Sequence, residues 1–485
     1  MNELHFSWIE AAVLAPLVGA ALIPLRSDPD RARRCSLVAS AIALACTVGA
    51  WIDLAVLDAF EAHDRWDLAE RLFHRDLLVV DELSAPLLPL VALQFLVTFL
   101  ATLRTKASRF SFTMALATES ITLATLACKE PWLLVTLLAA APVFPAVELV
   151  RRGESPRVFV LHMALFAILL VGGQAIVAGA APGSDAAICG LAMLGVAALV
   201  RSGAAPLHCW HADLFERASL GAAILFVTPM TGAYAAVRLV LPTAPAWVLH
   251  LIALASLATA VYAAGMALVQ RDARRFFSFL LLSNSSLVLV GLELVTPLGL
   301  VGALCVWLSV SLALTGFGLA LRSIESRCGR IDLARYHGMF RATPTLAGFF
   351  LLTGLASIGF PGTLGFVAAE LLIEGAIDAA PLVGVIVLFA SALNGLAVMH
   401  AYFRIFTGCE HSGTIDLRIR PAERVAVLAL SLLILGGGLY PQPGVSSRRH
   451  AAAALLDQRN EHLKQNVTDA ASRPAAKSAA GESQR

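Results

Sequence analysis

The segment RSGAAPLHCWHADL places several groups that can carry charge next to a helix breaker. Arg201 ends an apolar run, and small residues lead from it to Pro206. His208, His211 and Asp213 follow closely. An arginine carries a fixed positive charge, whereas a histidine changes its charge near neutral pH. A segment of this kind can hold or pass on a charge inside a chain that is otherwise strongly apolar.

Two glutamates also lie inside apolar runs. Glu119 sits in MALATESITLATLA, and Glu370 sits in GFVAAELLIEG. An ionisable side chain at membrane depth is costly, so such residues mark candidate ion paths. We expect Glu119 to be the partner of Arg201. The predicted ion path comprises Arg201, Glu119, Glu370 and His208.

The elements that must position these residues are membrane-spanning helices. The chain has 485 residues, of which 58% are hydrophobic and only 14% are charged. Because an ordinary soluble domain carries about 25% charged residues, this composition predicts an all-α polytopic membrane protein. The net charge of +2, with scattered Lys and Arg, gives no indication of nucleic acid as a partner.

The sequence has no motif for a cofactor. None of its cysteines form a C-x-x-C pair, and there is no G-x-G-x-x-G or Walker A loop. We therefore expect no metal and no cofactor in this chain. An isolated enzyme is disfavoured because no catalytic constellation is present. Any enzymatic role would be that of a non-redox membrane subunit of a proton-translocating oxidoreductase.

About fourteen apolar runs are long enough to cross a bilayer at roughly 20 residues each. The loops between them alternate in arginine content. RSDPDRARR, RTKASR, RRGESPR and QRDARR are rich in arginine, whereas KEP, AAPGSDAA and PTAPAW lack it. Since Lys and Arg favour the cytoplasmic side, this alternation predicts an even number of spans. Both termini would then lie on the outer side of a bacterial inner membrane.

Two of the predicted spans are interrupted. Pro206 interrupts the seventh, and Pro361 with Gly362 interrupts the twelfth, within SIGFPGTLGF. Proline removes a backbone donor, and unpaired backbone survives at membrane depth only where it is buried in protein or lines a wet cavity. Broken helices five spans apart are what an inverted repeat would produce, with spans 4–8 repeated upside down by spans 9–13.

The predicted organisation follows from these spans. It comprises N-terminal helices 1–3, a first repeat, a second inverted repeat, a last span with its preceding loop, and a polar, largely disordered tail. The tail has room for a short helix at 449–464. The corresponding ranges are 1–109, 110–240, 246–406, 407–442 and 443–485.

Four motifs resemble those of one known family. VRSGAAPLHCWHADLFERAS resembles V-K-x-P-x-x-P-L-H-T-W-L-P-D-A-H, and GAYAAVRL resembles the G-x-Y-x-x-x-R that follows it. ALVQRDARRFFSFLLLSNSSLVLVG and GLASIGFPGTLGFVAAELLI resemble two further signatures. The family comprises the proton-translocating antiporter-like subunits L, M and N of NADH–quinone oxidoreductase, with relatives in multisubunit cation/proton antiporters. Subunit M is the most similar in length and layout.

The resemblance implies two half-channels joined by a polar chain along the membrane midplane. In the family, a Glu–Lys pair in the first half stores a proton. Further Lys and His residues carry it to a Lys or Glu on the broken twelfth helix. A buried lysine releases its proton readily, and a nearby carboxylate reverses that tendency. The implied partners are the lipid bilayer and other membrane subunits of a multi-subunit complex.

The sequence departs from the family where that chemistry lies. Ala139 or Ala140 stands in place of the glutamate of span 5. Arg201 replaces the lysine of span 7, and an arginine cannot hand on a proton as lysine does. Met230 and Asn284 replace the lysine of span 8 and the histidine of span 10. The charges that move the proton in the family are therefore largely missing.

Glu370 lies one position away from the family carboxylate of span 12, which is about 100° of rotation on a helix. The matches that survive belong mainly to the scaffold. We predict that Asp213, Asp272 and Arg275 stabilise the cytoplasmic face and do not carry ions.

Three functions remain open. The first is a proton- or cation-translocating membrane subunit of a complex related to NADH–quinone oxidoreductase. The second is the membrane subunit of an ion-driven inorganic-carbon uptake complex, with a large soluble zinc protein as partner. The third is a degenerate scaffold that does not transport. The missing span-5 glutamate and the methionine at Met230 favour the second or third over an ordinary pump.

Overall fold

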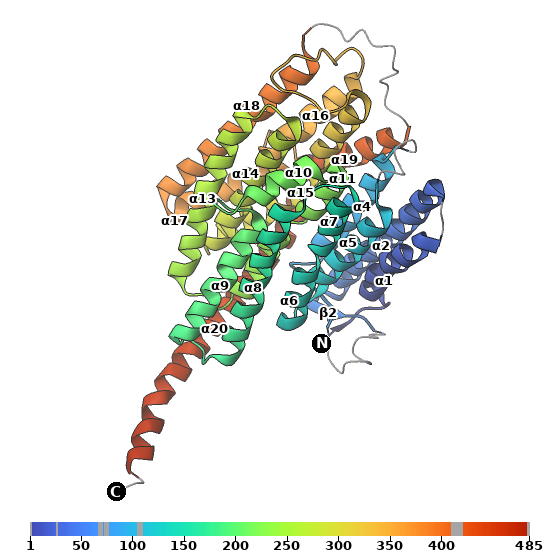
Figure 1. Cartoon of the computed structure of the whole chain (residues 1–485). Helices are drawn as coiled ribbons and strands as arrows, with labels where there is room; N and C mark the ends of the chain where they lie inside the picture. The colour runs from blue at the N-terminus through green and yellow to red at the C-terminus, as the bar shows by residue number, and fades with distance from the viewer. Residues whose placement is uncertain are drawn as a thin grey trace.

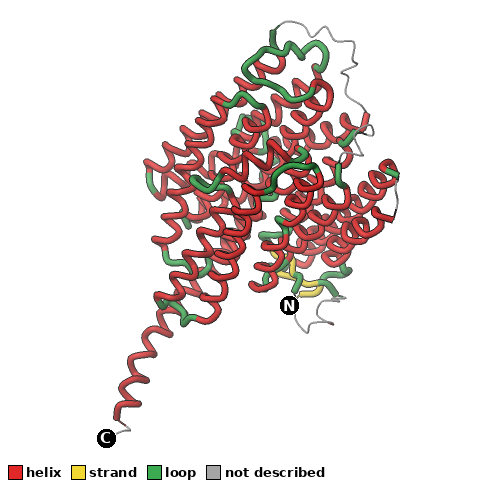
Figure 2. Tube along the Cα trace, viewed as in Figure 1, coloured by secondary structure: helices red, strands yellow, loops and turns green. Residues whose placement is uncertain are grey.

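The computed structural model describes residues 2–25, 28–65, 71, 77–103, 110–408 and 421–482, with side chains as far as Lys464. Long helices dominate the molecule, and β1 and the far end of α20 point to the same end of the bundle (Figure 1). Figure 2 shows helix almost throughout, with a single small sheet near the start of the chain. We call the end that carries this sheet the sheet end, and the other the opposite end.

The N-terminal part is a group of four helices. Both α2 and α5 pack on α1 and on α4. Asp28 caps α2 by accepting from the N–H of Asp30, and Pro29 begins that helix, where its missing donor costs nothing. The short 3₁₀ turn η1 (Ile23–Leu25) follows the first helix. The four helices are α1 (Trp8–Leu22), α2 (Pro29–Leu57), α4 (Leu87–Ala101) and α5 (Phe112–Ala127).

The middle of the chain contains several helices that are interrupted by proline or glycine. The elements are α6 (Pro131–Ala140), α7 (Val143–Arg151), α8 (Arg157–Gly179), α9 (Asp185–Ser202), α10 (Cys209–Arg217), α11 (Leu220–Val227), α12 (Thr231–Ala235) and the π-helix η3 (Ala236–Val240). Pro142 separates α6 from α7, and Pro229 separates α11 from α12.

The remaining helices include α14, whose apolar stretch is buried and which packs mainly on α13 and α15. They are α13 (Ala246–Val269), α14 (Ala273–Glu293), α15 (Pro297–Cys328), α16 (Pro344–Ser357), α17 (Gly365–Ala379), α18 (Pro381–Phe406), α19 (Pro421–Leu439) and α20 (Gln442–Glu482). Within the described ranges, 10 helical stretches are long and apolar enough to cross a membrane, and shorter apolar helices add to them. The protein is thus a mostly helical, multi-pass membrane protein.

A three-stranded sheet corrects the all-α prediction. Its strands are β1 (Asn2–Glu3), β2 (Glu61–His63) and β3 (Val79–Asp81), in the order β1-β2-β3. β1 pairs parallel with β2, and β2 pairs antiparallel with β3. Strands this short contain too little alternation of apolar and polar residues for a sequence pattern to reveal them.

The polar segment after Tyr440 is also different from the prediction. α20 is helical from Gln442 to Glu482, whereas the sequence predicts a largely disordered tail with a short helix at 449–464. Two buried arginines anchor it: Arg448 donates to the carbonyls of Leu83, at 3.1 Å, and of Glu82, and Arg459 donates to that of Leu241 at 2.5 Å. The prediction failed because these anchors look like ordinary solvated charges in the sequence.

The crossing of α15 and α17 offers a test of the packing. A Cβ added at Gly375 would overlap backbone atoms of Gly299, which cannot move aside. Gly375→Ala should therefore lower the thermal midpoint of the purified protein, by the equivalent of about 1–3 kcal/mol of overpacking. Gly348→Ala is the matched control, because nothing lies within 4 Å of a Cβ there. Equal midpoints for the two variants would show that this crossing is not close-packed.

Candidate functional site

The break in the seventh predicted span lies between α9 and α10. Gly203 follows α9 with φ +76°, a conformation that glycine adopts readily. The backbone N–H of Ala205 then donates to Oγ1 of Thr259 on α13 at 3.0 Å. Pro206 has no N–H to satisfy. The freed backbone of the break is thus partly bonded to a neighbouring helix.

Arg201 lies in the last turn of α9, beside this break, with only 4% of its surface exposed. Its Nη2 donates to the carbonyl of Phe226 at 3.2 Å, and its guanidinium carbon lies 4.0 Å from the centre of the Phe226 ring. The indole ring of Trp210 is 5.8 Å away. In the described part of the chain, no carboxylate lies at ion-pair distance from Arg201. The charge is held by a carbonyl, by ring faces and by the negative end of the α9 dipole.

The predicted pair between Glu119 and Arg201 is wrong for the described residues. Glu119 is 0% exposed and accepts a 2.7 Å hydrogen bond from Oγ of Ser40 on α2. Its other oxygen has no partner in the part of the chain that the structure describes. Glu119 therefore belongs to the contact between α5 and α2. A sequence of apolar runs does not determine which helices become neighbours.

Two histidines follow the break. His208 lies at the start of α10, with Nε2 3.1 Å from the hydroxyl of Tyr262. His211 is buried, and its Nδ1 lies 2.7 Å from Oγ of Ser278 on α14. The sequence prediction selected His208 and missed His211. The signal that could have identified His211 is its spacing of three residues from His208, because residues three apart lie on the same side of a helix.

A second, neutral polar contact joins α14 to α13 and α18. Ser283 donates to the carbonyl of Ala260 at 2.8 Å, and Nδ2 of Asn394 donates to Oγ of Ser283 at 2.9 Å. Oδ1 of Asn394 has no partner among the described residues. These groups are buried and carry no charge. A buried acceptor of this kind is a natural place for a bridging water molecule.

The second break separates α16 from α17. Gly359 and Gly362 take φ values of +79° and +85° on either side of Phe360 and Pro361, so the helix unwinds where the sequence predicts. A cavity of about 20 Å³ lies beside the break, which is room for one water molecule. Its polar lining comes from Asn284, Ser309, Ser357 and Ser391.

Glu370 does not face this cavity. Ala369 lines the cavity, whereas Glu370 is exposed on the outer surface of α17. The displacement by one position is the cause, since one residue turns the side chain by about 100°. Glu374 and Asp378 are exposed on the same helix at intervals of four residues, so they share the face of Glu370.

An ion-pair cluster lies at the sheet end, close to α5 and η3. Arg238 binds Asp81 through both Nη atoms, at 2.7 and 2.9 Å, and its Nε donates to the hydroxyl of Tyr234 at 3.0 Å. Lys129 lies 3.7 Å from Asp81 and 2.5 Å from Glu61. Burial by itself would raise the pKa of Asp81, but the charges of Arg238 and Lys129 lower it well below its usual range.

The residues predicted to be structural lie at the opposite end. Asp213 pairs with Arg217 at 2.6 Å. Asp272 caps α14 by accepting backbone N–H groups of its first turn. Arg275 lies 3.7 Å from Glu216. The contact of Arg275 with Glu216 connects α10 with the start of α14.

Two broken helices with buried polar groups beside them, in a multi-pass helical protein, are typical of membrane ion-transport proteins. A family model described as NADH:quinone oxidoreductase/Mrp antiporter, TM, matches residues 158–394. The NAD(P)H-quinone oxidoreductase chain 4 1 of Synechococcus sp. (strain JA-3-3Ab) is 28% identical over 91% of each chain. The F(420)H(2) dehydrogenase subunit M of Methanosarcina mazei is 26% identical over 53% of each chain.

Solved structures share the fold. A chain of respiratory complex I from Thermus thermophilus has a TM-score of 0.80 at 22% identity, covering 93% of this chain and 99% of that one. A chain of the Mrp complex from Dietzia sp. DQ12-45-1b has a TM-score of 0.79 at 19% identity, covering 94% and 98%. The family model and the two relatives show that our chain is similar to antiporter-like membrane subunits, and the solved structures show that it has their fold.

The Asp81–Arg238 pair gives a pH-dependent prediction. Asp81→Asn should cost about 3 kcal/mol at pH 7, because Arg238 is left without its buried counter-charge. The lowered pKa of Asp81 supplies stability above the pKa of an unfolded aspartate, near 3.9. That stability is lost as the pH falls towards the lower pKa of the folded state. The difference in thermal midpoint between the two proteins should thus shrink below about pH 4.

Thermal unfolding from pH 3 to pH 8 measures this difference. Asp58→Asn is the control, since Asp58 is exposed and ends α2 with φ +47°, which asparagine tolerates. If the thermal midpoint of Asp81→Asn lies below that of the wild type by the same amount at every pH, Asp81 has a packing role instead.

Proposed function

We propose that this chain is a proton- or cation-translocating membrane subunit of a multi-subunit complex related to NADH–quinone oxidoreductase. The observation that carries the proposal is the buried charge of Arg201 at a helix break, which has no carboxylate partner among the described residues. A desolvated cation with no carboxylate to neutralise it is costly. Such a charge is retained in a membrane protein mainly where it acts on an ion path.

In this proposal Arg201 is a fixed electrostatic element and does not carry the proton. His211 and His208 are the titratable groups next to it, and Nε2 of His211, which has no partner among the described residues, can bind water. From His211 the path continues through Ser278 and the Ser283–Asn394 hydrogen bond. Hydroxyl groups and trapped water then transfer protons without adding charge to the interior.

The two broken helices fit an inverted repeat in this proposal. The first unit runs from α5 to η3, within residues 110–240, and the second from α13 to α18, within residues 246–406. The break between α9 and α10 then corresponds to the break between α16 and α17. About fourteen spans, with both termini on the outer side of the inner membrane, complete this arrangement.

Other membrane subunits are the partners, and α17 is a place where one would bind. Glu370 and Glu374 are exposed on α17, which in this proposal is the second half of the broken twelfth span. Exposed carboxylates at that depth are stable when they face a water-filled gap or a cation of a neighbouring helix. We therefore assign Glu370 to a subunit contact in place of the interior path.

A degenerate scaffold is the second candidate. It is favoured by the interior of the second unit, where the position corresponding to the family carboxylate, Ala369, bears no charge. It predicts that Arg201 matters only for stability, which distinguishes it from the first proposal.

Replacing Arg201 separates transport from scaffolding. Arg201→Met removes a buried charge for which the described part of the chain offers no carboxylate partner, so we expect an unchanged or higher thermal midpoint. Proton or cation flux in membrane vesicles that contain the assembled complex should fall at least about tenfold. Arg201→Lys should restore or raise the flux, because lysine can release its proton. Arg275→Gln is the control on the surface, and full flux in Arg201→Met would favour the scaffold.

The identity of the complex is tested by mild purification of the tagged chain from its native membrane. We expect quinone-reductase or related redox subunits to co-purify. A large soluble zinc protein in their place would support the alternative in which ion flow drives the uptake of inorganic carbon. Recovery of the chain alone, from a membrane in which its complex is stable, would contradict both.

A further inference from the structure

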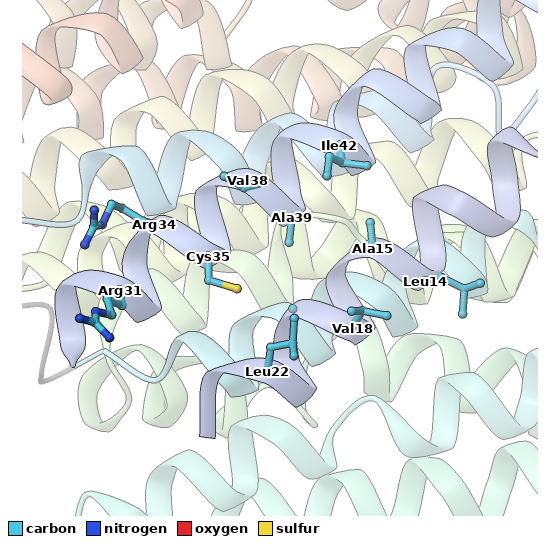
Figure 3. Close-up of a pocket in the computed structure, with 11 residues that line it drawn as sticks. Leu14, Ala15, Val18, Leu22, Arg31, Arg34, Cys35, Val38, Ala39 and Ile42 are labelled. Atoms are coloured by element: carbon cyan, nitrogen blue, oxygen red, sulfur yellow. The ribbon is translucent and has the colours of Figure 1, made fainter. Parts of the chain in front are cut away.

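A groove runs between α1 and α2 on the outer surface of the helical bundle (Figure 3). Both helices lie at the edge of the molecule, as the dark blue elements of Figure 1 show. The groove has a volume of about 780 Å³. It is far too large for an ordinary packing defect, which leaves room for a water molecule or two.

Small side chains form the floor of the groove. Ala15 and Gly19 come from α1, and Cys35 and Ala39 come from α2. A Cβ at Gly19 would lie 2.9 Å from that of Ala39, so the two backbones approach closely there. Small residues at such a crossing are typical of helices that pack within a membrane.

Larger apolar side chains form the walls. Leu14, Val18 and Leu22 project from α1, and Val38 and Ile42 project from α2. All five are exposed in this chain. A floor of small residues between branched walls makes a long apolar channel that is open on one side.

Two arginines lie at one end of the groove. Arg31 and Arg34 are three residues apart and therefore share a face of α2 (Figure 3). Arg31 lies 3.4 Å from a carboxylate oxygen of Asp28, whereas in the described chain no carboxylate lies at ion-pair distance from Arg34. Arg33 turns the other way and donates to the carbonyls of Thr102 and Leu100, both at 3.0 Å. The open end of the groove thus carries an excess of positive charge.

The length of the groove distinguishes a lipid from a helix. From Arg31 to Ile42 the groove follows α2 for about 17 Å, at 1.5 Å per residue. This is close to half of the ~30 Å hydrocarbon core of a bilayer. A transmembrane helix of a partner would need an apolar surface that continues through both leaflets. An acyl chain fills one leaflet, with its headgroup at the level of the arginines.

We propose that this groove binds one anionic phospholipid. Its phosphate lies against Arg31 and Arg34, whose guanidinium groups match phosphate oxygens. One acyl chain lies between Val18 and Val38 along the floor. Anionic lipids are abundant at the cytoplasmic surface of membranes, where the arginine-rich loops of this chain are expected.

Native mass spectrometry of the delipidated full-length protein tests the proposal. The probes are phosphatidylglycerol and phosphatidylcholine with identical acyl chains. We expect one molecule of phosphatidylglycerol to be retained in preference to phosphatidylcholine. Each arginine should contribute roughly fivefold to that preference, so Arg31→Gln with Arg34→Gln should remove most of it. Both side chains are on the surface, so the variant should fold.

A second variant tests the apolar part. Ala15→Leu fills the floor and should weaken the binding of both lipids without changing the preference between them. Arg335→Gln is the control, since Arg335 is 82% exposed in a loop far from the groove along the chain. Equal retention of the two lipids by the wild type would overturn the proposal. So would an equal loss of the preference for phosphatidylglycerol in Arg335→Gln. A photo-cross-linker at Val38 that captures a protein subunit would also overturn it.

Discussion

The burial of Arg201 beside a helix break is the constraint on which the centre of this structure depends. A guanidinium at this depth needs partners, and no carboxylate supplies one among the described residues. The end of α9, the Phe226 carbonyl and two aromatic rings take that role. Gly203 and Pro206 end the helix at that point, so the C-terminal dipole of α9 lies next to the charge. The break and the charge therefore support each other.

The charges that hold the fold together lie elsewhere. Arg274 binds Glu325 at 2.8 Å, and Arg327 binds Glu423 at 2.5 Å, in both cases near helix ends. Asp81 and Arg238 form a comparable pair at the sheet end. Each of these buried charges lies at hydrogen-bond distance from its counter-charge, which offsets the cost of burying it. A chain built in this way can lose midplane charges and keep its fold.

The sequence supports the membrane class, the helix breaks and the family, because composition, proline positions and motif spacing are local signals. It does not reveal the neighbours of Glu119, since the packing of α5 on α2 depends on contacts between distant segments. The sequence also does not determine which way Glu370 faces. A displacement of one residue changes the direction of the side chain, and only the rotation of α17 in the structure shows that Glu370 is exposed. The sheet and α20 were missed because short strands and anchoring arginines leave no periodic pattern.

The surroundings of the two helix breaks differ. A buried positive charge and two histidines lie at the first break, whereas the described cavity beside the second break is lined by neutral groups. A fixed positive charge opposes the passage of a cation, so an ion can pass Arg201 only when another group or a movement offsets that charge. Within the described residues, no carboxylate is close enough to do so. In the function proposed above, an adjacent subunit supplies the charge or the movement that offsets Arg201, so transport by this chain depends on its assembly.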